Sequence, residues 1–217
     1  MREQFEISVP QDWGDITLKQ YLALQKDLDN YKDDKEAQEA TLIVHLCGLS
    51  ADKIQTLTKE SYNELITLIG KLFREREHQL QPIIKFTNND YGFEPNLSKM
   101  SYGAYVDITK YDVLAIDDNW ADIMNILYRP VTKLYKDSYS IQPYDGELSR
   151  DKWYDVTMDV HFGAYFFFVH LLKDLQNSIL NSTMQTSEIP PNIKSTLVKS
   201  GKLIQQLSNW PEETSNK

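Results

Sequence analysis

The stretch from Val156 to Leu175 constrains the fold more than any other part of the sequence, because it is apolar on nearly every side of a helix. A helix that is hydrophobic all round must be buried by its own protein, by a partner or by lipid. A membrane span needs about 20 mostly apolar residues, and Asp159, His161, His170 and Lys173 interrupt this stretch. We therefore expect residues 156–175 to form a central helix that other helices surround.

The remaining patterns predict a mainly α fold with a small β hairpin or sheet, which is an α+β protein. The 217 residues are enough for one large domain or two small lobes. We expect an N-terminal strand and helical lobe at 1–80, a β hairpin at 81–99 and a C-terminal helical lobe at 100–180. Residues 181–217 are expected to form a polar tail with a weak helix.

Two short regions have strand character. Phe5–Val9 alternates apolar and polar residues and ends at Pro10. Ile83–Phe86 and Tyr91–Glu94 flank a turn-forming segment, which predicts a hairpin. Because an isolated hairpin is marginal in water, we expect it to pair with the N-terminal strand.

Helix boundaries are marked by capping residues. Thr17 with Gln20, and Ser61 with Glu64, have the spacing of a capping box. Gly48 is placed to end a helix. Trp120, Ile123, Met124 and Leu127 share one helix face, and Pro130 is expected to end that helix.

An internal similarity has two interpretations. Ile16-Thr17 followed by Tyr21 matches Met100-Ser101 followed by Tyr105. Either helix starts simply look alike because capping chemistry is shared, or the chain holds two related lobes separated by the hairpin.

The totals disfavour several function classes. The net charge is −9 and basic residues form no cluster, so binding to nucleic acid or to an anionic membrane is not expected. Cys47 is the single cysteine, which suits a reducing compartment. The first residues lack a signal-peptide pattern, so we expect the protein to stay in the cytoplasm where it is made.

Candidate metal and catalytic residues are few. Asp117, Asp118 and Asp122 are either Mg²⁺ ligands or helix-start residues, with Asp118 as N-cap and Asp122 in the first turn. The histidines and Cys47 lack the spacing of a zinc site, and no nucleophile or phosphate-binding motif is present. No cofactor is expected, although a Mg²⁺-dependent helical enzyme stays an alternative.

Arg129 also has two interpretations. It is either a cation at a helix C-terminus or a binding anchor in a patch with Tyr128, Tyr135 and Tyr139, because Tyr and Arg are frequent in interface hot spots. Together with the apolar helix, this gives a set of candidate partner-binding residues: Trp120, Tyr128, Arg129, Tyr135, Phe166 and Phe167.

Four segments of the chain stand out when they are taken in order. The first holds Pro10, Trp13, Ile16, Thr17 and Tyr21, and the others are Pro95–Asp107, Trp120–Val131 and Met158–Phe168. In this order they resemble segments of tail or baseplate assembly proteins of tailed bacteriophages, including tail assembly chaperones. The resemblance covers roughly residues 10–180 in pieces. The Trp120–Val131 segment and the apolar helix are its most specific parts.

The resemblance implies a non-enzymatic role in which the chain binds a phage tail, hub or tape-measure protein. Such a protein acts in the host cell cytoplasm or becomes part of the virion. An apolar, aromatic-rich helical surface on an acidic protein suits the covering of hydrophobic segments of a partner. The alternatives are the Mg²⁺-dependent enzyme and a phage-encoded regulator that binds a host protein.

Overall fold

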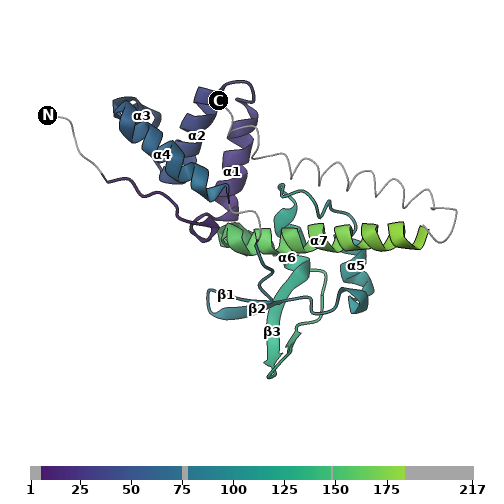
Figure 1. The fold of residues 1–217 in the computed structure, drawn as a ribbon. Coiled ribbons are helices and arrows are strands. Elements are labelled where there is room, and N and C mark those ends of the chain that lie inside the picture. The colour runs from purple at the N-terminus through teal and green to yellow at the C-terminus, as the bar shows by residue number, and fades with distance from the viewer. Residues whose placement is uncertain (1–5, 75–77, 148, 184–217) are drawn as a thin grey trace.

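Helix α7 (Met158–Thr183) lies across the middle of the molecule, with a helical lobe on one side and a β-sheet on the other (Figure 1). The computed structural model describes residues 6–74, 78–147 and 149–183. The predicted central helix is confirmed, although it begins two residues later than expected and continues to Thr183. The mainly α fold with a small antiparallel sheet is also confirmed.

The helical lobe consists of α1 (Leu18–Asp29), α2 (Lys35–Cys47), α3 (Ala51–Thr56) and α4 (Lys59–Leu72). A small core of Ile43, Leu49, Leu65 and Ile69 holds α2, α3 and α4 together.

Side chains at the helix starts explain where these helices begin. Thr17 and Gln20 form the predicted capping box of α1, and Gly48 ends α2 with φ +65°. The predicted box at Ser61 is wrong, because Thr58 caps α4 one turn earlier by accepting a hydrogen bond from Ser61 N–H at 3.1 Å.

The N-terminal segment does not form the predicted strand. Residues 6–10 have no regular secondary structure, and Phe5 lies outside the described residues. Ile7 and Val9 instead pack against the small core of the helical lobe. Their alternating pattern therefore reflects one apolar edge of an irregular segment, and the hairpin obtains its partner strand from elsewhere.

That partner comes from the C-terminal half of the chain. The sheet is antiparallel in the order β1 (Ile83–Phe86), β2 (Asn89–Phe93), β3 (Tyr128–Leu134) and β4 (Tyr139–Ile141). The predicted first hairpin is confirmed. The helix before Pro130 ends at Leu127 as expected, but the chain then continues directly into β3, with Pro130 inside the strand.

Two helices and three short 3₁₀ turns complete the fold. These are α5 (Tyr102–Ile108), α6 (Trp120–Leu127), η1 (Trp13–Asp15), η2 (Leu97–Lys99) and η3 (Asp151–Asp155). Every residue of α6 is buried, which exceeds the single buried face predicted for it. No helix within the described ranges is long and apolar enough to cross a membrane.

Two similar segments far apart in the sequence pair with each other. Trp13–Leu18 and Trp153–Met158 both read Trp-x-Asp, then Ile or Val, Thr, and Leu or Met. Each forms a 3₁₀ turn, one extended stretch and the start of a long helix. We call them the paired Trp segments.

The contact between the paired Trp segments is reciprocal. Leu18 N–H donates to Val156 O at 3.0 Å, and Met158 N–H donates to Ile16 O at 2.7 Å. The tryptophan, the β-branched residue and the last residue of each segment are buried in the main core. The start of α1 is thereby fixed to the start of α7, and the helical lobe shares a core with the sheet.

A close backbone approach also fixes α7. A Cβ at Gly163 would lie 2.6 Å from Gln79 O, so only glycine allows the chain before β1 to cross the helix there. Two hydrogen bonds hold this crossing: Gln81 Nε2 donates to Asp159 Oδ2 at 2.7 Å, and Tyr128 Oη donates to Gln81 O at 2.7 Å.

The polar segment predicted at 181–217 lies almost wholly outside the described residues. Its first three positions belong to the end of α7. The weak helix expected near residues 193–207 falls outside the described ranges.

Candidate interaction surfaces

Trp120 is a core residue and not a surface anchor. Its side chain is 0% exposed, and its Nε1–H donates to His161 Nδ1 at 3.2 Å. Because an indole nitrogen only donates, His161 Nδ1 must accept, and its Nε2–H donates to Trp153 O at 3.1 Å. Trp153 Nε1–H donates in turn to Asn125 Oδ1 at 3.2 Å.

This buried polar network keeps His161 neutral. Burial is the main cause that lowers the pKa of His161 to about 4, outweighing hydrogen bonds to backbone groups that act in the opposite direction. A neutral imidazole with one donor and one acceptor matches the two partners available. His161 therefore has a structural role in the core, although in the sequence it is one of the polar residues that interrupt the apolar stretch.

Tyr128 and Arg129 are buried as well. Tyr128 lies in the main core between Phe93 and Trp153. Arg129 forms a buried ion pair with Glu94 and donates from a second guanidinium nitrogen to Ile126 O. The interpretation as a binding anchor does not describe Arg129, because its side chain is buried and paired with Glu94, where it joins β3 to the end of β2. Its hydrogen bond to Ile126 O does place the cation at the C-terminal end of α6, as the other interpretation expected, although Arg129 itself lies in β3.

Phe166 and Phe167 are half-buried on different sides of α7. Phe166 stacks on His78 with ring centroids 6.3 Å apart, while Phe167 packs edge-on against Phe93 at 5.2 Å. Both rings pack against the main core of the protein. Their partial burial leaves less of each ring for another molecule than an exposed side chain offers.

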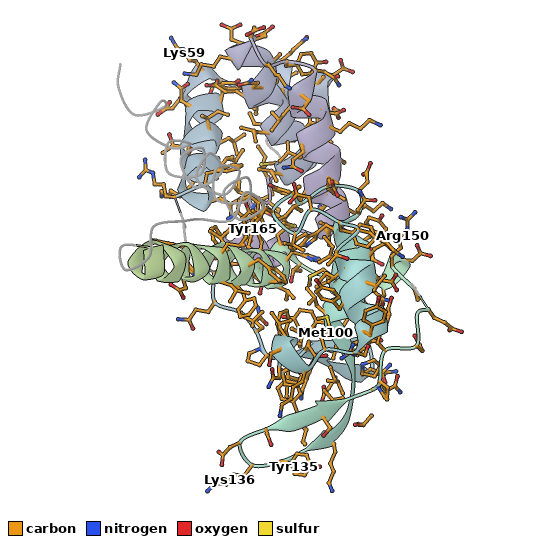
Figure 2. The ribbon with its side chains drawn as sticks, turned by 90° about the vertical axis from the view of Figure 1, so that its right-hand side faces the viewer. Lys59, Met100, Tyr135, Lys136, Arg150 and Tyr165 are labelled. Carbon is orange, nitrogen blue, oxygen red and sulfur yellow. The ribbon has the colours of Figure 1, made fainter. Side chains whose placement is uncertain are left out.

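Tyr135 is the one member of the candidate set with a freely exposed side chain. It is 51% exposed and lies between β3 and β4, directly after Leu134, with Lys136 beside it (Figure 2). Lys133 Nζ lies 5.0 Å from the centre of its ring, in a cation–π contact. We call residues 133–138 the hairpin tip.

The hairpin formed by β3 and β4 is held in place by contacts between its base and β2. A Cβ at Gly92 would lie 2.6 Å from the Tyr139 ring, so glycine allows that ring to cross β2. Tyr139 Oη donates to Phe93 O at 2.8 Å. The exposed tip is therefore carried by an ordered two-stranded arm.

Two further exposed aromatic residues lie on α5, and neither is among the candidate binding residues named from the sequence. Tyr102 is 82% exposed and Tyr105 is 58% exposed. Residues three apart share one side of a helix, so the two rings form one surface. Tyr105 is the counterpart of Tyr21 in the internal similarity, but Tyr21 is buried and Tyr105 is exposed. Thr17 and Ser101 both cap a helix, which agrees with the interpretation that shared capping chemistry makes the two helix starts look alike.

The face of α5 opposite these rings is tied to the loop before η3. Tyr144 Oη donates to Asp107 Oδ2 at 2.7 Å, and Lys110 Nζ lies 2.6 Å from Asp107 Oδ1. These contacts lower the pKa of Asp107, chiefly through its hydrogen bond with Lys110. The loop thus holds α5 in position with its two tyrosines outward.

The three aspartates proposed as metal ligands do not converge. Asp122 is buried and lies 3.5 Å from Arg150, while Asp117 accepts a hydrogen bond from Asn119 N–H at 2.8 Å. Asn119, not Asp118, is the N-cap of α6. No group of three or more His, Cys, Asp or Glu side chains suited to a metal occurs in the part of the chain that the structure describes.

The other polar candidates have structural partners. His45 Nε2 lies 2.7 Å from Asp27 Oδ2 and joins α2 to α1. Burial raises the pKa of the Cys47 thiol, which makes a poor nucleophile. A shallow hollow beside the paired Trp segments is lined by Lys19, Asp151, Tyr154 and Asp155.

Comparison with protein-family models, with curated proteins and with solved structures gave no match.

Proposed function

We propose that this chain is a non-enzymatic tail or baseplate assembly or structural protein of a tailed bacteriophage, acting through protein–protein contacts. It would act in the host cell cytoplasm or within the virion, and its partner would be a tail, hub or tape-measure protein. The sequence resemblance supplies the class of partner. Exposed aromatic side chains on α5 support a role in protein–protein contact.

The observation that carries this proposal is the outward position of Tyr102 and Tyr105. Tyrosine is enriched in protein interfaces because its ring offers a large apolar area and its hydroxyl a hydrogen bond. Contiguous exposed apolar surface is a mark of protein–protein interaction sites. The helix cap at Ser101 and the hydrogen bond from Tyr144 to Asp107 fix α5, so that Tyr102 and Tyr105 are held in exposed positions.

The test is an affinity capture of the tagged protein from cells that produce its natural system, followed by mass spectrometry. We expect a tail, hub or tape-measure protein in near-stoichiometric amount. The amount of partner recovered with the variant Tyr102→Ser/Tyr105→Ser should be at least about tenfold lower, as expected when hot-spot side chains are truncated. The matched control Tyr102→Phe/Tyr105→Phe keeps the rings and should retain most of it.

Two results would contradict the proposal. One is the capture of a host enzyme in place of tail proteins, which would favour a regulator of the host. The other is equal capture by the serine and phenylalanine variants, which would remove α5 from the interface.

A further inference from the structure

The hairpin tip combines features that are unusual for an acidic protein. Every residue from Thr132 to Ser138 is exposed, including the apolar Leu134 and the aromatic Tyr135. Within the tip, Lys133 and Lys136 outnumber Asp137, although the chain as a whole carries a net charge of −9. A cationic, partly apolar surface at the end of an ordered arm favours an acidic partner that also offers an aromatic contact.

The α1–α2 corner, residues 27–39, has the complementary character. It carries six carboxylates and two lysines. Lys32 pairs with Asp29 at 3.2 Å, and Lys35 pairs with Glu39 at 3.7 Å, so the lysines are already engaged locally. Tyr31 is 45% exposed among these carboxylates.

The tip and the corner lie at opposite ends of the molecule. Helix α1 starts at the paired Trp segments and runs away from the sheet, so its connection to α2 is far from the hairpin (Figure 1). Tyr135 and Lys136 lie at one end in Figure 2, and Lys59, at the start of α4, at the other. One molecule cannot bring the two surfaces together.

We infer that the hairpin tip of one copy binds the α1–α2 corner of a second copy. Lys133 and Lys136 then face carboxylates such as Asp33 and Glu36, while Leu134 and Tyr135 cover Tyr31. Contacts between different surfaces on identical chains extend head to tail, giving a ring when the rotation closes and an open chain when it does not. This self-association is separate from the proposed binding of a tail component through α5.

The test uses the purified full-length chain in sedimentation velocity over a concentration series. We expect the average mass to rise with concentration and to fall when salt is raised, because exposed charge pairs are screened. The variant Lys133→Glu/Lys136→Glu should weaken association at least about tenfold. The variant Asp33→Lys/Glu36→Lys should do the same, and it leaves the Asp34 cap of α2 intact.

The chain that carries all four substitutions provides the decisive result. Reversing both surfaces restores their complementarity, so its association should return to within a few-fold of the wild type. The control Lys59→Glu/Lys71→Glu changes the net charge as much as the tip variant does but lies outside both surfaces, and it should associate like the wild type. Circular dichroism of each variant checks that the fold is intact.

The inference is overturned if the wild type stays monomeric up to about 1 mM, where even a millimolar association is half-formed. It is also overturned if the tip variant associates like the wild type, or if the fourfold variant fails to recover. Because no tail component is present, these results are independent of the capture experiment.

Discussion

Thr17 and Thr157 lie opposite each other in an isolated antiparallel bridge, and each stands directly before the first residue of a long helix. The residues on either side exchange the two hydrogen bonds of the paired Trp segments. The bridge is therefore close to symmetric, with Leu18 and Met158 in equivalent buried places.

Exchanging the two residues tests the symmetry of the bridge. Leu18→Met and Met158→Leu conserve volume, so each should lower the free energy of unfolding by less than about 1.5 kcal/mol. The double variant should lose no more than the two single losses combined, whereas Leu18→Ala should lose about 2–5 kcal/mol. Urea unfolding followed by tryptophan fluorescence measures all four. A double exchange that is as damaging as the alanine variant would argue against equivalence.

The buried His161 should make stability depend on pH. Its pKa is lowered to about 4 by burial, whereas a histidine in the unfolded chain titrates near 6.5. Between these values the unfolded state binds more protons than the folded state, so the free energy of unfolding falls as the pH falls. The loss from pH 6.5 to pH 4 should be on the order of 3 kcal/mol.

The measurement is a series of urea unfolding curves across this range, for the wild type and for His161→Gln. The glutamine variant should be less stable at neutral pH because its amide does not reproduce both hydrogen bonds of the imidazole. It should also show a smaller slope with pH in this window. An unchanged slope would assign the pH dependence to other groups.

Gly163 should tolerate no side chain. A Cβ there would lie 2.6 Å from Gln79 O, a backbone atom that cannot move away cheaply. We expect Gly163→Ala to lower the free energy of unfolding by about 1–3 kcal/mol, as overpacking does. The matched control is Gly70→Ala in α4, where a Cβ meets nothing within 4 Å.

That control should raise stability by about 0.5–1 kcal/mol, because alanine is the better helix former. Thermal or chemical unfolding of both variants gives opposite signs for the same chemical change. Destabilisation by Gly70→Ala would show that the helix, not the crossing segment, sets the cost at Gly163.

Removing one partner of the Glu94–Arg129 ion pair should lower the free energy of unfolding more than the removal of both charges does. Both side chains are about nine-tenths buried. Glu94→Gln leaves a buried guanidinium without its counter-charge and should lose about 3–5 kcal/mol. The double variant Glu94→Gln/Arg129→Met removes that charge as well, so it should lose less than the sum of the two single variants. A double-mutant cycle measures this coupling.

Much of the fold could be predicted because local chemistry decides it. Thr17 and Gly48 mark the helix boundaries that they were expected to mark, and the first hairpin forms where β-branched residues flank a turn. The sequence could not show that the chain beyond Leu127 becomes a strand. The residues of β3 pair with β2 over a long separation, and such pairing overrides local propensity.

The paired Trp segments could have been found. Trp13–Leu18 and Trp153–Met158 match at five of six positions by residue class, whereas the internal similarity given in the sequence analysis pairs Thr17 with Ser101. Of the candidate site residues, Tyr135 is exposed because it lies in a turn. Trp120 and Tyr128 are buried by packing that joins α6, α7 and the sheet, and periodicity alone does not reveal which aromatic rings such packing encloses.

The bridge at Thr17 also sets an order of events during synthesis. Its partner Thr157 lies 140 positions further along the chain, so the ribosome must complete most of the protein before the two meet. The small core around Ile43 and Leu65 needs only early residues and can form first. Trp13, in contrast, can meet Tyr21 and Phe73 early but gains its contact with Phe162 only after the start of α7 emerges. Until then its indole is only partly covered, and the nascent chain presents that apolar surface to other molecules.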